Sequence, residues 1–183
     1  TSIPEEIVNS NISTLFISQN KICKLPIMPK SLLSLYASYC NIDDISECFN
    51  NCSYLNKLCL NGNPIKKFPV DVNFLNLEVL CLSQCELEIF PHSLLIFPEL
   101  SNKIRTLDLS CNHITSVPEE FSAPNLTEFD LSHNQLNQLP DFVKFQRLTV
   151  LKLTSNPVHA NIQLLKNPFL DSVDLYSTKI SRI

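Results

Sequence analysis

A fixed spacing of apolar residues constrains this 183-residue chain more than any other feature of its sequence. The stretch NKIRTLDLSCNHITSVP, residues 102–118, shows the pattern when Ile104 is position one. Apolar residues stand at positions one, four, six, eleven and fourteen, a small polar residue at nine and proline at fifteen. The template fits eight times, with repeats that begin near residues 12, 32, 55, 77, 104, 126, 148 and 170. Such a period is typical of solenoids, in which each repeat buries its apolar face against its neighbours.

Position nine of the template is restricted to short residues that can donate a hydrogen bond. From the first repeat to the last it reads Asn20, Cys40, Asn63, Cys85, Asn112, Asn134, Asn156 and Thr178. The chain turns inward after each strand, so its backbone N–H and C=O groups become buried and need partners. We therefore expect these side chains to form a ladder, in which each amide serves its own turn and the following one.

These features together form the leucine-rich-repeat pattern, L-x-x-L-x-L-x-x-N/C-x-L. The sequence therefore predicts an α/β-type solenoid: a curved right-handed stack with a parallel β-sheet on the concave face and extended or 3-10 segments on the convex face. Six prolines stand at position fifteen or its equivalent: Pro4, Pro26, Pro69, Pro91, Pro118 and Pro140. In this respect the chain resembles the intracellular LP class of repeats. We expect one domain over residues 1–183, with residues 1–11 as a cap or the remnant of a preceding repeat.

Composition argues against several functional classes. Glycine occurs once, at Gly62, so the glycine-rich loops that cradle phosphates are excluded and we expect no cofactor. The formal net charge is −4 and no basic run is longer than Lys66–Lys67, so direct nucleic-acid binding is not expected. The sequence contains no run of eighteen apolar residues, so no membrane span is predicted. We expect a monomer or one part of a longer chain, which binds another protein and no small-molecule substrate.

The eight cysteines follow the repeat rather than a disulfide framework, which favours an intracellular protein, in the cytoplasm or nucleus. Cys59 and Cys81 stand at position five of adjacent strands, where we expect them to be exposed on the inner surface. Cys48 and Cys52 lack a second ligand pair, so no metal site is predicted. Sequons at residues 11, 51 and 125 keep a secreted receptor ectodomain open as an alternative.

A binding face follows from the alternation of side chains along each strand, because positions three, five and seven are left on the concave surface and positions two and eight on its rims. The predicted contact residues are Phe16, Tyr36, Tyr39, Cys59, Cys81, Arg105, Asp108, Glu128, Asp130, His133, Lys152 and Asp174. The N-terminal half of this face is apolar and aromatic and the C-terminal half is charged, a combination that protein interfaces favour. The column of aspartates lacks an accompanying nucleophile, so no catalytic residue is predicted. The competing surface is the long outer excursion at residues 93–103.

Three stretches resemble one family more closely: PKSLLSLYASYCNI (29–42), LSNKIRTLDLSCNHI (100–114) and FLDSVDLYSTKI (169–180). They are similar to the leucine-rich-repeat substrate receptors of cullin-2 ubiquitin ligases. The resemblance implies a non-catalytic arm that presents a substrate protein to the ligase. A regulatory or scaffold domain of a signalling enzyme, such as a regulator of a small GTPase, kinase or phosphatase, is the alternative.

Overall fold

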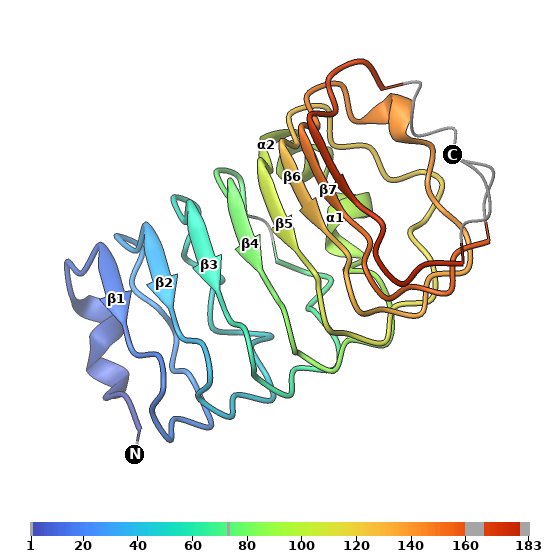
Figure 1. Ribbon diagram of the computed structural model, residues 1–183. Coiled ribbons are helices and arrows are strands. Elements are labelled where there is room, and N and C mark those ends of the chain that lie inside the picture. Colours follow the sequence, from blue (N-terminus) through green and yellow to red (C-terminus); the bar gives the residue numbers. More distant parts are fainter. Residues whose placement is uncertain (1, 73, 160–166, 180–183) are drawn as a thin grey trace.

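The computed structural model describes residues 2–72, 74–159 and 167–179, and its strands form one eight-stranded parallel sheet in chain order (Figure 1). The strands are β1 (Thr14–Phe16), β2 (Ser34–Tyr36), β3 (Lys57–Cys59), β4 (Val79–Cys81), β5 (Thr106–Asp108), β6 (Glu128–Asp130), β7 (Val150–Lys152) and β8 (Ser172–Asp174). Each strand consists of template positions three, four and five, which confirms the predicted solenoid. Of the predicted eighth repeat, Ile180 and Ile183 lie outside the described residues.

The strands are in register, so equivalent template positions lie beside one another along the whole sheet. Position four is the central residue of each strand and is buried in β2 to β7; its two neighbours are half-buried in all of these strands except β3, where Cys59 is buried as well. Leu35 pairs with Leu58, and Leu58 with Leu80, in this inward row. Positions three and five point to the other side of the sheet, because successive side chains of a strand alternate.

Phenylalanines fill the core behind the C-terminal half of the sheet. Phe121, Phe129 and Phe145 are buried and lie in mutual contact, with ring centroids 5.6 to 6.1 Å apart. Phe129 stands at position four of β6, whereas the other two come from the convex segments. The aromatic cluster therefore joins the sheet to the convex side of the stack.

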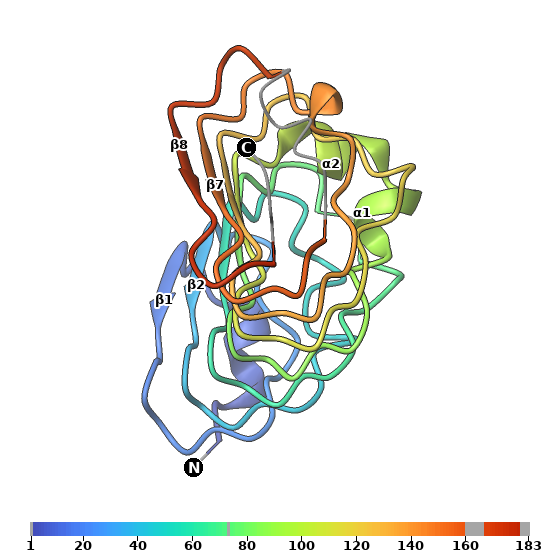
Figure 2. The same cartoon turned by 45° about the vertical axis from the view of Figure 1, so that its right-hand side comes forward.

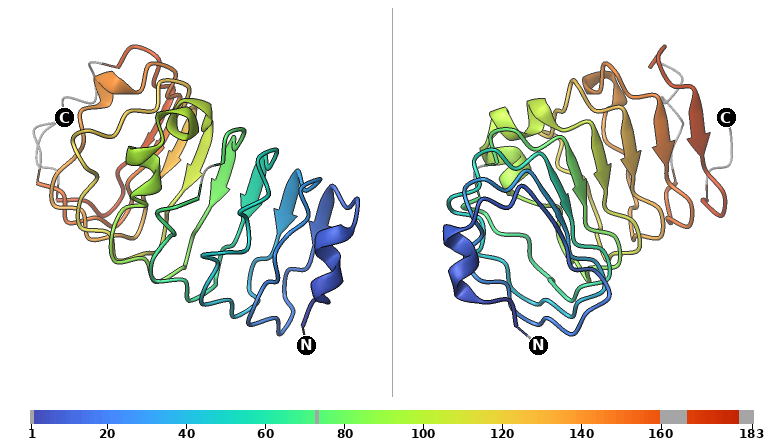
Figure 3. Two further views of the ribbon diagram at one scale, coloured as in Figure 1. Left: turned by 180° about the vertical axis from the view of Figure 1, so that it is seen from behind. Right: turned by 90° about the vertical axis from the view of Figure 1, so that its left-hand side faces the viewer.

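The convex side carries short helices, seen opposite the sheet in Figure 2 and from behind in Figure 3. Two are 3-10 helices, η1 (Glu5–Asn9) and η2 (Phe142–Lys144), as expected for this side. The excursion at residues 93–103 adds two short α-helices to the expected extended and 3-10 segments, α1 (Ser93–Ile96) and α2 (Pro98–Lys103). The longer repeat leaves room for them, and Pro98 occupies the first turn, where a missing N–H is tolerated. No helix in the described ranges has the length and apolar character that a membrane span requires.

Four asparagines at position nine bond to two turns, as expected of a ladder, but the second turn is the preceding one: Asn63, Asn112, Asn134 and Asn156. Asn112 Oδ1 accepts hydrogen bonds from the backbone N–H groups of Cys85 (3.0 Å) and Leu87 (2.9 Å). Its Nδ2 donates to the carbonyls of Leu82 (2.8 Å) and Leu109 (2.9 Å). Each amide therefore binds its own turn and the preceding one, not the following one.

Asn63, Asn134 and Asn156 are buried and bind their own and the preceding turns in the same direction. Asn20 is exposed and bonds only to carbonyls of its own turn, because β1 is the edge strand and no described turn of the stack lies before it. Thr178 also donates to its own turn, at Leu175 O (2.8 Å).

The two ladder cysteines replace only the donor function of asparagine. The Sγ of Cys40 donates to Ile17 O (3.0 Å) and that of Cys85 to Leu60 O (3.3 Å). In these turns a backbone N–H of the preceding repeat donates to the carbonyl of the cysteine instead of to a side chain. A thiol can therefore stand in the ladder when the main chain supplies the missing acceptor.

Position eight, just before the ladder, adopts a left-handed conformation in every repeat. The residues are Gln19, Tyr39, Gly62, Gln84, Cys111, His133, Ser155 and Ser177, with φ between 54° and 67°. This conformation turns the chain away from the strand and aims the next side chain into the core.

Candidate functional site

The concave face is the side-chain surface of positions three and five of the sheet, and its N-terminal end carries an aromatic stack. Phe16 in β1 and Tyr36 in β2 are register partners whose rings lie 4.6 Å apart and almost parallel, at 14°. Phe16 is 72% exposed. Single exposed apolar side chains are ordinary, whereas exposed rings that lie in contact with each other form a contiguous apolar patch, which is a feature of interaction sites.

Lys57 extends the aromatic stack and was not among the predicted contact residues. Its Nζ lies 5.2 Å from the centre of the Tyr36 ring, within the range of a cation–π interaction. Lys57 is at position three of β3, next to the strand that carries Tyr36. The signal in the sequence was its template position, since a position-three side chain faces the same surface.

Cys59 was predicted to be exposed on the inner surface, but it is buried and retains only 9% of its accessible surface. It lies between Tyr36 and Cys81 in the position-five row, so a small side chain is covered by its larger surroundings. Cys81 is half-buried. The interaction between these neighbouring thiols lowers the pKa of Cys59 and raises that of Cys81.

The carboxylates of the predicted column are fixed by their own turns. Asp108 Oδ1 accepts from the backbone N–H (3.0 Å) and the hydroxyl (2.7 Å) of Ser110. Asp130 accepts from the N–H of Ser132 at 2.9 Å. Asp174 accepts from the N–H of residue 176 at 3.0 Å, and this bond lowers its pKa. We call Asp108, Asp130 and Asp174 the acidic row.

Two cations lie among these carboxylates, and each is paired. Arg105 Nε lies 3.1 Å from Glu78 Oε2. Lys152 Nζ lies 3.1 Å from Glu128 and 3.4 Å from Asp130, and the bond to Glu128 raises its pKa. Strands β4 to β8 present six carboxylates at positions two, three and five: Glu78, Asp108, Glu128, Asp130, Asp171 and Asp174. This half of the concave face therefore keeps a negative excess after the two ion pairs are formed.

Two predicted contact residues, Tyr39 and His133, lie at position eight on the rim rather than on the strands. Tyr39 is 52% exposed, and its hydroxyl donates to Gln84 Oε1 at 3.3 Å, two repeats away. His133 is exposed in the same left-handed turn of its own repeat. They border the concave face without joining the acidic row or the aromatic stack.

Cys48 and Cys52 have a structural role on the convex side. Both are buried, and their Sγ atoms donate to the carbonyls of Leu25 (3.3 Å) and Pro29 (3.5 Å) of the preceding repeat. Among the described residues no group of three or more potential ligands could hold a metal ion.

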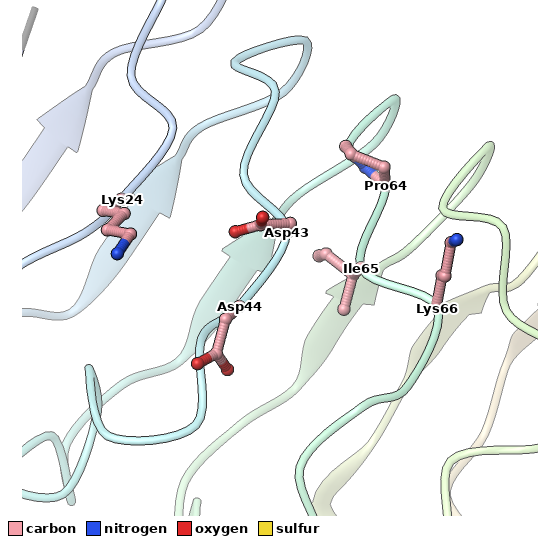
Figure 4. A pocket seen from close by; sticks show the side chains of 6 residues that line it. All are labelled: Lys24, Asp43, Asp44, Pro64, Ile65 and Lys66. Atoms are coloured by element: carbon pink, nitrogen blue, oxygen red, sulfur yellow. The ribbon is translucent and has the colours of Figure 1, made fainter.

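Two further hollows lie outside the concave face. Figure 4 shows the first, on the edge where the first three repeats leave their strands; it is lined by Lys24, Asp43, Asp44, Pro64, Ile65 and Lys66. Its two carboxylates and two lysines leave no excess charge that would select a partner. The second is lined by Gln146, Arg147, Thr149 and Phe169 at the opposite edge. The outer excursion directs Leu94 and Leu100 into the core, so much of its apolar surface is used in folding.

Comparisons with known proteins agree with this geometry. The family model "Leucine rich repeat" matches residues 102–158. No significant sequence match to a curated protein was found. Among solved structures, the LRIM1/APL1C complex superposes with a TM-score of 0.76 at 22% identity, over 98% of this chain and 38% of that one.

Two bacterial structures show the same fold. The functional domain of InlJ from Listeria monocytogenes, which includes a cysteine ladder, gives a TM-score of 0.76 at 19% identity, over 100% of this chain and 43% of that one. A leucine-rich-repeat protein of Leptospira interrogans gives 0.68 at 22% identity, over 98% and 59%. The present chain therefore spans less than two thirds of each of these three structures.

Proposed function

Because the chain carries leucine-rich repeats and folds as a leucine-rich-repeat solenoid, we propose that it is a non-catalytic module that binds a protein partner on its concave face. The observation that carries the proposal is the meeting of an exposed aromatic stack and a fixed acidic row on one continuous sheet. Neither feature contributes to the core. Both offer contact groups that are already ordered before a partner arrives.

The aromatic stack supplies an apolar anchor. Phe16 and Tyr36 hold each other in place, so little side-chain entropy would be lost when a partner covers them. Aromatic residues are enriched among the few residues that dominate binding energy in protein interfaces.

The acidic row selects for a basic partner. Hydrogen bonds from the backbone orient Asp108 and Asp130, and their charge is only partly balanced by Lys152. Complementary charge on the partner would steer its approach and fix its register. We therefore propose a partner segment that carries lysine or arginine.

The distance between the two features defines the spacing within that segment. Phe16 is in β1 and Asp108 in β5, four strand intervals of about 4.8 Å apart, or about 19 Å in total. An extended chain covers about 3.3 Å per residue, so about six residues would separate an apolar side chain on the stack from a basic one at the row. A partner segment of this kind would run across the strands.

Quantitative affinity capture with matched variants tests this proposal. Phe16→Ala removes the anchor, whereas Ile96→Ala removes another exposed apolar side chain from the convex α1. Asp108→Asn with Asp130→Asn removes two charges but keeps an amide oxygen for the two backbone bonds. Glu119→Gln with Glu120→Gln removes two exposed charges elsewhere.

We expect the same partner to be lost or strongly reduced with both concave-face variants and retained with both controls. The interaction is then measured with the purified partner. Equal binding by all four variants would exclude the concave face as the docking surface.

A finer proposal is that the partner is a substrate of a cullin-2 ubiquitin ligase, supported by the resemblance of residues 29–42, 100–114 and 169–180. Partners enriched for ubiquitin-ligase subunits would support it, whereas co-purification with a GTPase, kinase or phosphatase would favour the regulatory alternative. An intracellular location is part of this proposal. It is supported by eight cysteines that are all free thiols, four of which donate to backbone carbonyls from buried positions. Mass spectrometry of protein isolated from cells, showing blocked or disulfide-bonded ladder cysteines, would contradict it.

A further inference from the structure

Two cysteines of the concave face are placed for direct reaction with one another. Cys59 and Cys81 are register partners in the adjacent parallel strands β3 and β4, and both occupy position five. Neighbouring strands lie about 4.8 Å apart, which falls in the range of Cα separations that disulfides bridge, roughly 4.4 to 6.8 Å. Both side chains leave the sheet on its concave side, because they occupy the same template position in paired strands.

This pair differs from the other buried cysteines of the chain. Cys40, Cys48, Cys52 and Cys85 each donate from Sγ to a backbone carbonyl of the preceding repeat. Within the described part of the chain, Cys59 and Cys81 make no such bond to a backbone carbonyl and stand beside each other in neighbouring strands. Their arrangement is therefore not explained by the ladder or by the convex packing.

The two thiols differ in acidity. The pKa of Cys59 is lowered, first by its interaction with the neighbouring Cys81 thiol and further by the charge of Lys57. The pKa of Cys81 is raised by the same interaction and by burial, so Cys81 remains the protonated partner. The thiolate is the form that reacts with oxidants, so Cys59 is the group that reacts first.

We propose that Cys59 and Cys81 form a reversible cross-strand disulfide when the protein meets a peroxide. The Cys59 thiolate attacks one peroxide oxygen, the O–O bond breaks, and Cys59 becomes a sulfenic acid while hydroxide leaves. The Cys81 sulfur then attacks the Cys59 sulfur, its proton goes to the departing hydroxide, and water is released. In total, two thiols and one hydrogen peroxide give one disulfide and two waters.

Reduction reverses the reaction through thiol–disulfide exchange. Cys59 is buried and Cys81 half-buried, so a reducing thiol would reach the bridge at the Cys81 sulfur. The bond would lie in the position-five row between Tyr36 and Asp108, where the aromatic stack gives way to the acidic row. Its effect on partner binding rests on the proposed function, but its formation does not.

Peptide mapping of the intact chain after treatment with hydrogen peroxide tests the proposal. Free thiols are blocked with an alkylating reagent before digestion with trypsin, and the digest is searched for a cross-link between residues 58–66 and 68–103. The second peptide contains Cys81 and Cys85, so fragment ions must place the bond at Cys81. We expect this cross-link in peroxide-treated protein, its absence from untreated protein and its loss after dithiothreitol.

Single variants supply the controls. Cys59→Ser and Cys81→Ser should abolish the cross-link, whereas Cys111→Ser, which removes another half-buried concave-side thiol, should leave it unchanged. The cross-link in the unaltered chain remains decisive if a variant fails to fold. The proposal is overturned if peroxide oxidises other cysteines while this link is missing, or if Cys59 passes to sulfinic acid with Cys81 unchanged.

Discussion

The ring of Tyr39 occupies the space that a side chain at Gly62 would need. A Cβ at residue 62 would lie 2.3 Å from Tyr39 Cδ1, and the tyrosine crosses this position to reach Gln84. Seven other position-eight residues adopt the same left-handed conformation without being glycine. The contact with Tyr39, rather than φ alone, therefore explains why the one glycine of the chain stands here.

Gly62→Ala should destabilise the protein by about 1 to 3 kcal/mol, of which the left-handed conformation of alanine accounts for roughly 1 to 2. The remainder is the displacement of the Tyr39 ring. The combination with Tyr39→Ser should remove that remainder, as measured by urea unfolding in a double-mutant cycle. An equal cost of Gly62→Ala with and without the ring would show that the contact is not the reason for the glycine.

Asn112→Ala should be among the most destabilising single substitutions in the chain. It removes five hydrogen bonds and leaves buried backbone groups of two turns without partners, at a cost of about 3 to 5 kcal/mol. Asn20→Ala is the matched control, because Asn20 is exposed and its cost should stay below about 1 kcal/mol. Equal shifts of the two urea midpoints would contradict the role given to the ladder.

Alkaline pH should weaken the fold through its buried thiols. Burial raises the pKa of Cys48, Cys52 and Cys85 from 9.0 to about 11. The protonated thiols are favoured in the folded state, so their contribution is complete below the unfolded pKa and is lost as pH rises from about 9 through 11. Each thiol contributes up to about 2 to 3 kcal/mol.

Urea unfolding at neutral pH and at about pH 10 measures this loss. The variant Cys48→Ala with Cys52→Ala lacks two of the three thiols, so it should lose less stability over the same interval. A pH dependence identical to that of the unaltered chain would assign the effect to other groups, such as lysine or tyrosine.

Partner binding should depend on salt through the acidic row. Exposed charges interact less as ionic strength rises, so affinity should fall between low and physiological salt. Asp108→Asn with Asp130→Asn should both weaken binding and flatten this dependence, while Phe16→Ala should weaken binding with the dependence unchanged. Isothermal titration calorimetry at several salt concentrations separates a loss of affinity from a change in its salt dependence. The same slope in all three proteins would contradict a basic partner.

The period of the sequence predicts the backbone well, because it fixes which positions face the core. The strands, the buried leucines and the buried Asn63, Asn112, Asn134 and Asn156 all follow from it. The period does not say whether an inward amide bonds to the preceding or the following turn, because both neighbours carry the same backbone groups. That choice depends on the handedness and offset of the stack.

Side-chain length limits the prediction of the concave face. Cys59 and Phe16 share template position five, yet one is covered and the other is 72% exposed, because the side chains around them differ in size. The reach of Lys57 over the Tyr36 ring and of Tyr39 to Gln84 also depends on conformations that a repeat pattern does not contain. Pairwise contacts between repeats are therefore the part that needed a structure.

The one-way bonding of the asparagines gives the stack an inherent polarity. Each amide hydrogen-bonds to the turn before its own. When one coil unfolds, the coil on its N-terminal side is therefore left with unpaired carbonyl and N–H groups. The coil on its C-terminal side still has the asparagine that bonds to its own turn. Damage should spread toward the amino end more readily than toward the carboxyl end. Amide hydrogens just upstream of a disturbed coil would then exchange with solvent sooner than those just downstream.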